Sequence, residues 1–211
     1  MENSEYNFAI KIIPDKNAVF SHLLGSLFND DVKRKLTREH LNVLDKVSKL
    51  GDDRLVAMTG ELLVENAVDS VLQAFMPTFK ETFKRPSFYT KIEFARALTL
   101  CPSHLFDSAH SIREIRNDFA HNLEVANFSM VSPKRIEKLR AQYRLYDWYT
   151  PPRIDSMNTA QVFIGLTYEI SIVLHAYALQ TAILRRYLHD EGFQKLLENF
   201  CASQHAAASP V

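Results

Sequence analysis

The most apolar segment of the chain, from Asn158 to about His189, constrains the fold more than any other feature. A helix that is apolar over its whole length must be buried in a large protein or in a membrane. Four polar residues interrupt the segment, so it lacks the uninterrupted apolar run of a membrane span: Gln161, Glu169, His175 and Gln180. We therefore predict a long central helix, buried in a helical bundle or a dimer.

Shorter segments elsewhere repeat their apolar residues at helical spacing. They cover residues 16–28, about 32 or 37 to 50, 54–76, 88–100, 103–121, 133–144 and 193–200. Residues of the kind that caps a helix precede several of them: Asp15, Asp52 or Asp53, Ser87 and Ser103. With 5 glycines and 8 prolines in 211 residues, this pattern predicts an all-α, multi-helix bundle.

The apolar face of the 54–76 helix is expected to consist of nine residues: Leu55, Met58, Leu62, Val64, Ala67, Val68, Val71, Leu72 and Phe75. Pro77 interrupts that helix, and the paired prolines Pro151 and Pro152 predict a loop after the basic helix. The length suits one domain, covering residues 1–211. We divide it into an N-terminal helical extension (1–52), a core (53–128), C-terminal helices (129–200) and a flexible tail (201–211).

Charge and cysteine content exclude several classes of function. Lysine plus arginine and aspartate plus glutamate each number 25, so the formal net charge is zero. Proteins that hold duplex DNA through many phosphates usually carry a basic excess, so direct binding of duplex DNA is not supported. Cys101 and Cys201 suggest neither a disulfide framework nor a zinc site. The first residues do not resemble a signal peptide, which predicts a cytoplasmic protein without a membrane segment.

Several side chains that could take part in catalysis or binding lie close together in one stretch, residues 111–121. On a helix, Ile112, Ile115 and Phe119 fall on one side. A second side carries two guanidinium groups, an amide and, one turn beyond, an imidazole, from Arg113, Arg116, Asn117 and His121. The stretch therefore predicts a core-packing face beside a face that could form a site.

The region from about residue 53 to 128 resembles the mannitol-operon repressor (MltR) family. A long helix is followed by Phe-Tyr-Thr-Lys-Ile-Glu-Phe-Ala-Arg-Ala-Leu-Thr-Leu (88–100), a short spacer and Ile-Arg-Glu-Ile-Arg-Asn-Asp-Phe-Ala-His (112–121). The resemblance covers about a third of the chain and implies a negative regulator of gene expression. Because no basic recognition helix is evident, such a regulator would act as an interaction protein through a protein partner.

The same decapeptide is similar to the motif of the HEPN superfamily of helical domains. That resemblance implies a metal-independent ribonuclease, a toxin or antiviral effector, with Arg116, Asn117 and His121 as its catalytic residues. It also implies a homodimer that brings two motifs together. On an ideal helix Arg116 and His121 lie about 140° apart, so one copy would surround a phosphate poorly.

Such a site would cleave RNA without a metal or cofactor. His121 would serve as acid or base, because imidazole titrates near neutrality. Arg113 and Arg116 would bind phosphate oxygens with their planar forks, and Asn117 would orient His121 or bind a phosphate.

A scaffolding role for the same side chains is an equal alternative. Asn117 and His121 could cap the helix, and the arginines could pair with acidic residues on the long helix or its neighbour. The candidate partners are Glu61, Glu65, Asp69 and Glu93. Glu65 and Asp69, four residues apart, are the expected supporting residues.

Two further candidates are weaker. Cys101, His104 and His110 are spaced closely enough to suggest a metal site, but a further ligand is not indicated, so no metal is expected. The basic helix Lys134–Arg144, followed by Tyr146, Trp148 and Tyr149, mixes cations with aromatic rings. It could bind nucleic acid, although a solvated helix is the commoner meaning of such a pattern.

Overall fold

The computed structural model describes residues 43–146 and 154–188. The helices expected at 16–28 and 193–200, the loop at 147–152 and the tail at 201–211 lie outside these residues. Every regular element within them is helical, which confirms the all-α prediction. A helical turn at 43–48 is followed by α4 (Asp53–Phe75), α5 (Phe79–Thr82), α6 (Phe88–Ala97), α7 (Ser103–His121), η1 (Phe128–Met130), α8 (Pro133–Tyr143), η2 (Arg144–Tyr146), η3 (Ile154–Ser156) and α9 (Thr159–Leu188).

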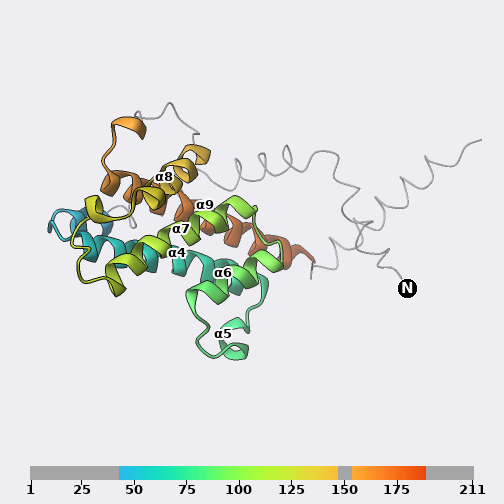
Figure 1. The fold of residues 1–211 in the computed structure, drawn as a ribbon. Coiled ribbons are helices and arrows are strands. Elements are labelled where there is room, and N and C mark those ends of the chain that lie inside the picture. Colours follow the sequence, from blue (N-terminus) through green and yellow to red (C-terminus); the bar gives the residue numbers. More distant parts are fainter. Residues whose placement is uncertain (1–42, 147–153, 189–211) are drawn as a thin grey trace, which may run out of the picture.

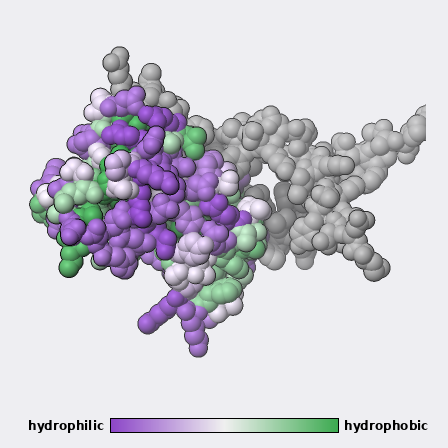
Figure 2. All heavy atoms as spheres, viewed as in Figure 1, coloured by the Kyte–Doolittle hydropathy of each residue, from purple (hydrophilic) through white to green (hydrophobic). Residues whose placement is uncertain are grey.

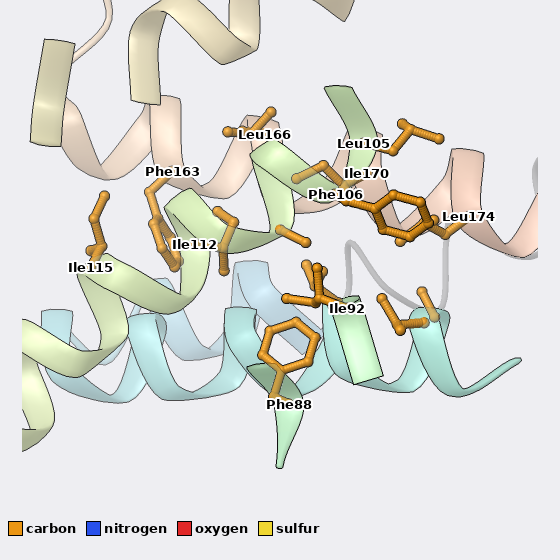
Figure 3. Close-up of a cluster of buried hydrophobic side chains, with 14 of the residues drawn as sticks. Phe88, Ile92, Leu105, Phe106, Ile112, Ile115, Phe163, Leu166, Ile170 and Leu174 are labelled. Atoms are coloured by element: carbon orange, nitrogen blue, oxygen red, sulfur yellow. The ribbon is translucent and has the colours of Figure 1, made fainter. Parts of the chain in front are cut away.

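The bundle is built around α4 and α9, which run side by side (Figure 1). Helix α7 packs against both of them, α6 lies on α4 and α7, and α8 lies on α7 and α9. Side chains of α6, α7 and α9 meet in one interior, as Ile92, Ile112 and Leu166 show (Figure 3). The helices α4 and α9 approach closely at Gly60, where an added Cβ would lie 2.6 Å from the ring of Phe163.

Local sequence signals account for several helix ends. The side chain of Asp52 accepts a hydrogen bond from the backbone N–H of Leu55, and that of Ser87 accepts one from Thr90. Ser103 is the first residue of α7 and makes no capping hydrogen bond, so its predicted capping role is wrong. Helix α6 ends before residue 100 because Thr99 takes a left-handed conformation (φ 50°).

The apolar segment at the C-terminal side forms α9, a core helix as expected. Val162, Phe163, Leu166 and Ile170 are buried in the common core. By length and composition alone, Thr159–Ile183 could cross a membrane, but half of its most apolar window is buried inside the protein. Such burial is typical of a bundle's central helix.

The expected apolar face of α4 is confirmed from Val64 to Leu72 and is wrong in the first half of the helix and at Phe75, which is 44% exposed. The helix buries Val56, Gly60, Val64 and their neighbours, whereas Leu55, Met58 and Leu62 are exposed by 40%, 38% and 56%. Gly60 on the inner face allows α9 to approach, and the three larger side chains lie on the other side of the helix. We call Leu55, Met58 and Leu62 the outer stripe of α4.

Candidate functional site

The stretch 111–121 lies in α7 and divides as the sequence predicts. Ile112, Ile115 and Phe119 are fully buried, and Phe119 packs edge-on against Phe128. Of its polar side chains, Arg113 lies beside α6, Arg116 beside α4, and Glu114 and Asp118 beside α8. This placement sets which acidic groups can reach each arginine.

Arg116 is held by a buried carboxylate. Its Nε lies 2.7 Å from Oε2 of Glu61, and the two side chains are 28% and 12% exposed. The Nε–H bond is not directed at that oxygen, so the contact is an ion pair rather than an aligned hydrogen bond. Arg116 Nη1 also donates to the side-chain oxygen of Asn117 at 3.2 Å. Two of the three expected catalytic residues are therefore engaged with the protein itself.

The environment of Glu61 changes the pKa of its carboxyl group. Burial raises the pKa of its carboxyl, and the positive charges of Arg116 and, more weakly, Arg113 oppose that rise. A buried carboxylate of this kind requires a partner, because an unpaired charge is costly inside a protein. Arg116 supplies it.

Arg113 is placed differently. Its guanidinium lies over the ring of Tyr89, with Cζ 5.1 Å from the ring centroid, a cation–π contact. The other lysine and arginines of α6 and α7 each reach a carboxylate: Lys91, Arg96 and Arg116. Among the described residues Arg113 makes no such ion pair, so its guanidinium keeps its capacity to bind an anion.

His121 is the last residue of α7 and is exposed. Within the described part of the chain it makes no hydrogen bond or ion pair. The structure thus joins Arg116 and Asn117 by a hydrogen bond and leaves His121, one helical turn beyond Asn117, without one.

The expected supporting residues have another partner. Lys91 of α6 lies 2.8 Å from Glu65 and 2.9 Å from Asp69. These carboxylates therefore fasten α6 to α4, and neither forms an ion pair with Arg113 or Arg116. The fourth candidate, Glu93, lies with Oε1 2.7 Å from Nε2 of His110 and accepts a hydrogen bond from that nitrogen when it carries a proton.

Lys91, Glu61 and Tyr89 are the important residues that sequence reasoning missed or ranked too low. Lys91 and Tyr89 belong to the segment 88–100, yet the sequence offered no means of pairing them with α4 and α7. Burial is the signal in hindsight: Glu61 falls on the buried face of α4, between Ala57 and Val64, and an acidic residue there needs a cation.

Most cations of the basic helix α8 contact carboxylates or carbonyl groups of the protein itself. Arg135 pairs with Asp118 and donates to the Glu114 carbonyl at 2.9 Å. Further contacts fix the remaining cations except Lys134: Lys138 to Glu114, Arg140 to the carbonyls of Ile154 and Met157, and Arg144 to Asp155. Trp148 and Tyr149 lie outside the described residues. The contacts of α8 therefore favour a scaffolding helix over a nucleic-acid surface.

The suggested metal ligands do not converge. Burial raises the pKa of the Cys101 thiol to about 12, and the His104 ring packs against Tyr146 with centroids 5.8 Å apart. His110 is bound to Glu93. The described residues hold no group of three histidine, cysteine, aspartate or glutamate side chains arranged to bind a metal.

Comparison with known proteins adds no relative: no family model, curated protein or solved structure matches the chain.

Proposed function

We propose that the protein is a helical interaction protein that lowers gene expression through a protein partner, as the resemblance to the MltR family implies. The observation that carries this proposal is the 2.7 Å ion pair between Arg116 and the buried Glu61. An arginine that neutralises a buried carboxylate stabilises the bundle and is poorly placed to stabilise a reacting phosphate.

The outer stripe of α4 supports a role in protein contacts. Leu55, Met58 and Leu62 follow one another at helical spacing and stay exposed. Apolar side chains gathered on one helix face are typical of protein–protein interfaces. We place the partner contact there, whether the partner is a second copy of the chain or another protein, and we place the protein in the cytoplasm.

A metal-independent ribonuclease remains the second candidate because His121 is exposed and free of protein contacts within the described residues. Arg113 would then bind phosphate, and Arg116 would have to act through its remaining N–H groups. A homodimer would supply the second motif.

Expression of the native chain and of His121→Ala in the same cells separates the two functions. For an interaction protein we expect intact total RNA and the same set of lowered transcripts with both chains. RNA decay caused by the native chain and abolished by His121→Ala would overturn the proposal and establish the ribonuclease.

The partner surface can be tested in the same assay. Leu62→Asp should abolish the lowering of transcripts, because it places a charge at the most exposed residue of the apolar stripe. Leu145→Asp is a matched control, since Leu62 and Leu145 are both 56% exposed and Leu145 lies in η2. Equal effects of the two substitutions would exclude the outer stripe as the contact.

A further inference from the structure

The segment between α4 and α6 carries a concentration of unpaired positive charge. Lys80, Lys84 and Arg85 are exposed, and within the described residues none of them forms an ion pair. Glu81 is the one acidic residue among them. In a chain of zero net charge, whose α8 cations are mostly bound internally, this is a distinct local excess. We call residues 77–87 the α5 lobe.

The lobe stands out from the body of the bundle. Figure 1 shows α5 hanging below α4 and α6, and hydrophilic side chains project from the lower edge of the view in Figure 2. Inside the lobe, Phe79 and Phe83 pack against Phe94 of α6, with ring centroids 5.7 and 5.0 Å away. These rings fix the lobe on the bundle, so its cations are presented on a supported surface.

Backbone strain marks the same place. Arg85 adopts a φ of 54°, a left-handed conformation that side chains other than glycine seldom take. The following residue is Pro86, which normally favours an extended conformation in the residue before it. The left-handed conformation of Arg85 turns the chain from the lobe into α6.

An exposed aromatic ring connects the lobe to the motif helix. Tyr89, 49% exposed, begins α6 directly after the lobe. Arg113 of α7 covers part of its ring, and the ring of His110 lies 5.4 Å from it. Tyr89 and Arg113 thus connect the end of the lobe to the polar face of α7.

We propose that the α5 lobe and Tyr89–Arg113 form a binding site for single-stranded nucleic acid. Flexible lysines and an arginine supply the sequence-independent attraction to phosphates. A tyrosine ring with a stacked guanidinium supplies the platform on which bases of a single strand stack. A duplex hides its base faces and would gain nothing from Tyr89. The site is separate from the outer stripe of α4 and goes beyond the proposed function.

The direct test measures the fluorescence anisotropy of labelled 20-nucleotide oligouridine and oligothymidine with the full chain, between 50 and 200 mM salt. We expect both strands to bind, because phosphates and exposed base faces are common to single-stranded RNA and DNA. Lys80→Gln/Lys84→Gln should weaken binding about tenfold and reduce the slope of log Kd against log salt by about 1.4, since each phosphate contact on a single strand contributes about 0.7.

Two matched controls separate a site from general attraction. Lys46→Gln/Lys134→Gln also removes two exposed lysines without ion pairs in the described residues, and should leave binding unchanged. Tyr89→Ala should weaken binding about tenfold, the loss expected from one stacked base, whereas Tyr89→Phe should bind as the native chain does.

Arg85→Gly is a further test of the lobe. It keeps the backbone conformation, removes the charge, and should also weaken binding.

Several results would overturn the proposal: no binding of either strand, equal losses from the two double-lysine variants, or Tyr89→Ala binding as the native chain does. Tighter binding of a 20-base-pair duplex, or of phosphatidylserine vesicles through the same lysines, would assign the lobe to another ligand. These measurements use purified protein, so their outcome is independent of the effect of His121→Ala on RNA in cells.

Discussion

The ends of helices depend on single residues, and Thr99 shows this most clearly. It takes the left-handed position at the end of α6, where its N–H bonds to the Arg96 carbonyl and that of Leu100 to the Ala95 carbonyl. Glycine normally occupies this position, as Gly51 does after the turn at 43–48 (φ 70°). A β-branched residue there is strained.

Thr99→Gly should therefore stabilise the protein by about 0.5 to 1 kcal/mol, because relief of a strain of about 1 to 2 kcal/mol outweighs the greater freedom of glycine in the unfolded chain. Chemical denaturation measures the change. Ala97→Gly, two residues earlier in α6, should instead cost about 1 kcal/mol. Equal destabilisation by both substitutions would show that Thr99 is not strained.

At the scale of elements, the packing of α4 on α9 depends on Gly60. A Cβ there would approach the Phe163 ring to 2.6 Å and the Thr167 hydroxyl to 3.2 Å. We expect Gly60→Ala to destabilise the protein by about 1 to 3 kcal/mol through overpacking, despite the better helix propensity of alanine. Asn66→Ala, on the exposed side of α4, should change the free energy of unfolding by less than about 0.5 kcal/mol. A stabilising effect of Gly60→Ala would contradict this packing.

The ion pairs of Lys91 with Glu65 and Asp69 join α6 to α4, and their contribution to stability should depend on pH. Burial lowers the pKa of Lys91, but its hydrogen bonds to Glu65 and Asp69 outweigh that effect and raise the pKa above its usual 10.5. Its stabilising contribution is therefore complete below pH 10.5 and is lost as the pH rises through the higher folded value. Lys91→Met should cost about 2 kcal/mol at pH 7, and the difference from the native chain should narrow at pH 11. A stability difference between the two proteins that stays constant with pH would show that the ion pairs of Lys91 do not stabilise the fold.

The helices could be predicted from the sequence, but their contacts could not. Periodicity and caps placed α4, α7, α8 and α9 to within a few residues of their observed ends. Glu65 and Asp69 were reasonable partners for the arginines, yet the way α6 lies on α4 brings Lys91 to them instead. Glu61, one turn earlier, reaches Arg116. Side-chain pairing between helices depends on their relative register, which periodicity within each helix does not determine.

At the scale of the whole molecule, the charged groups sort into two kinds. Those on α4, α6, α7 and α8 largely neutralise one another: Lys91, Arg96, Arg116, Arg135 and Lys138 each reach a carboxylate. The cations of the α5 lobe and Arg113 make no ion pair within the described residues. The apolar outer stripe of α4 forms a third kind of surface. Among the described residues the molecule therefore presents an apolar surface and a cationic surface, at different places on a bundle whose other charged groups largely pair with one another.

The central claim is that Arg116 serves the fold by neutralising Glu61. A double-mutant cycle of Arg116→Gln and Glu61→Gln, followed by denaturant unfolding at pH 7, tests it most directly. We predict that each single substitution destabilises the protein and that the two are coupled by about 1 to 2 kcal/mol. A coupling energy near zero, with Arg116→Gln as stable as the native chain, would contradict the claim and return Arg116 to the list of catalytic candidates.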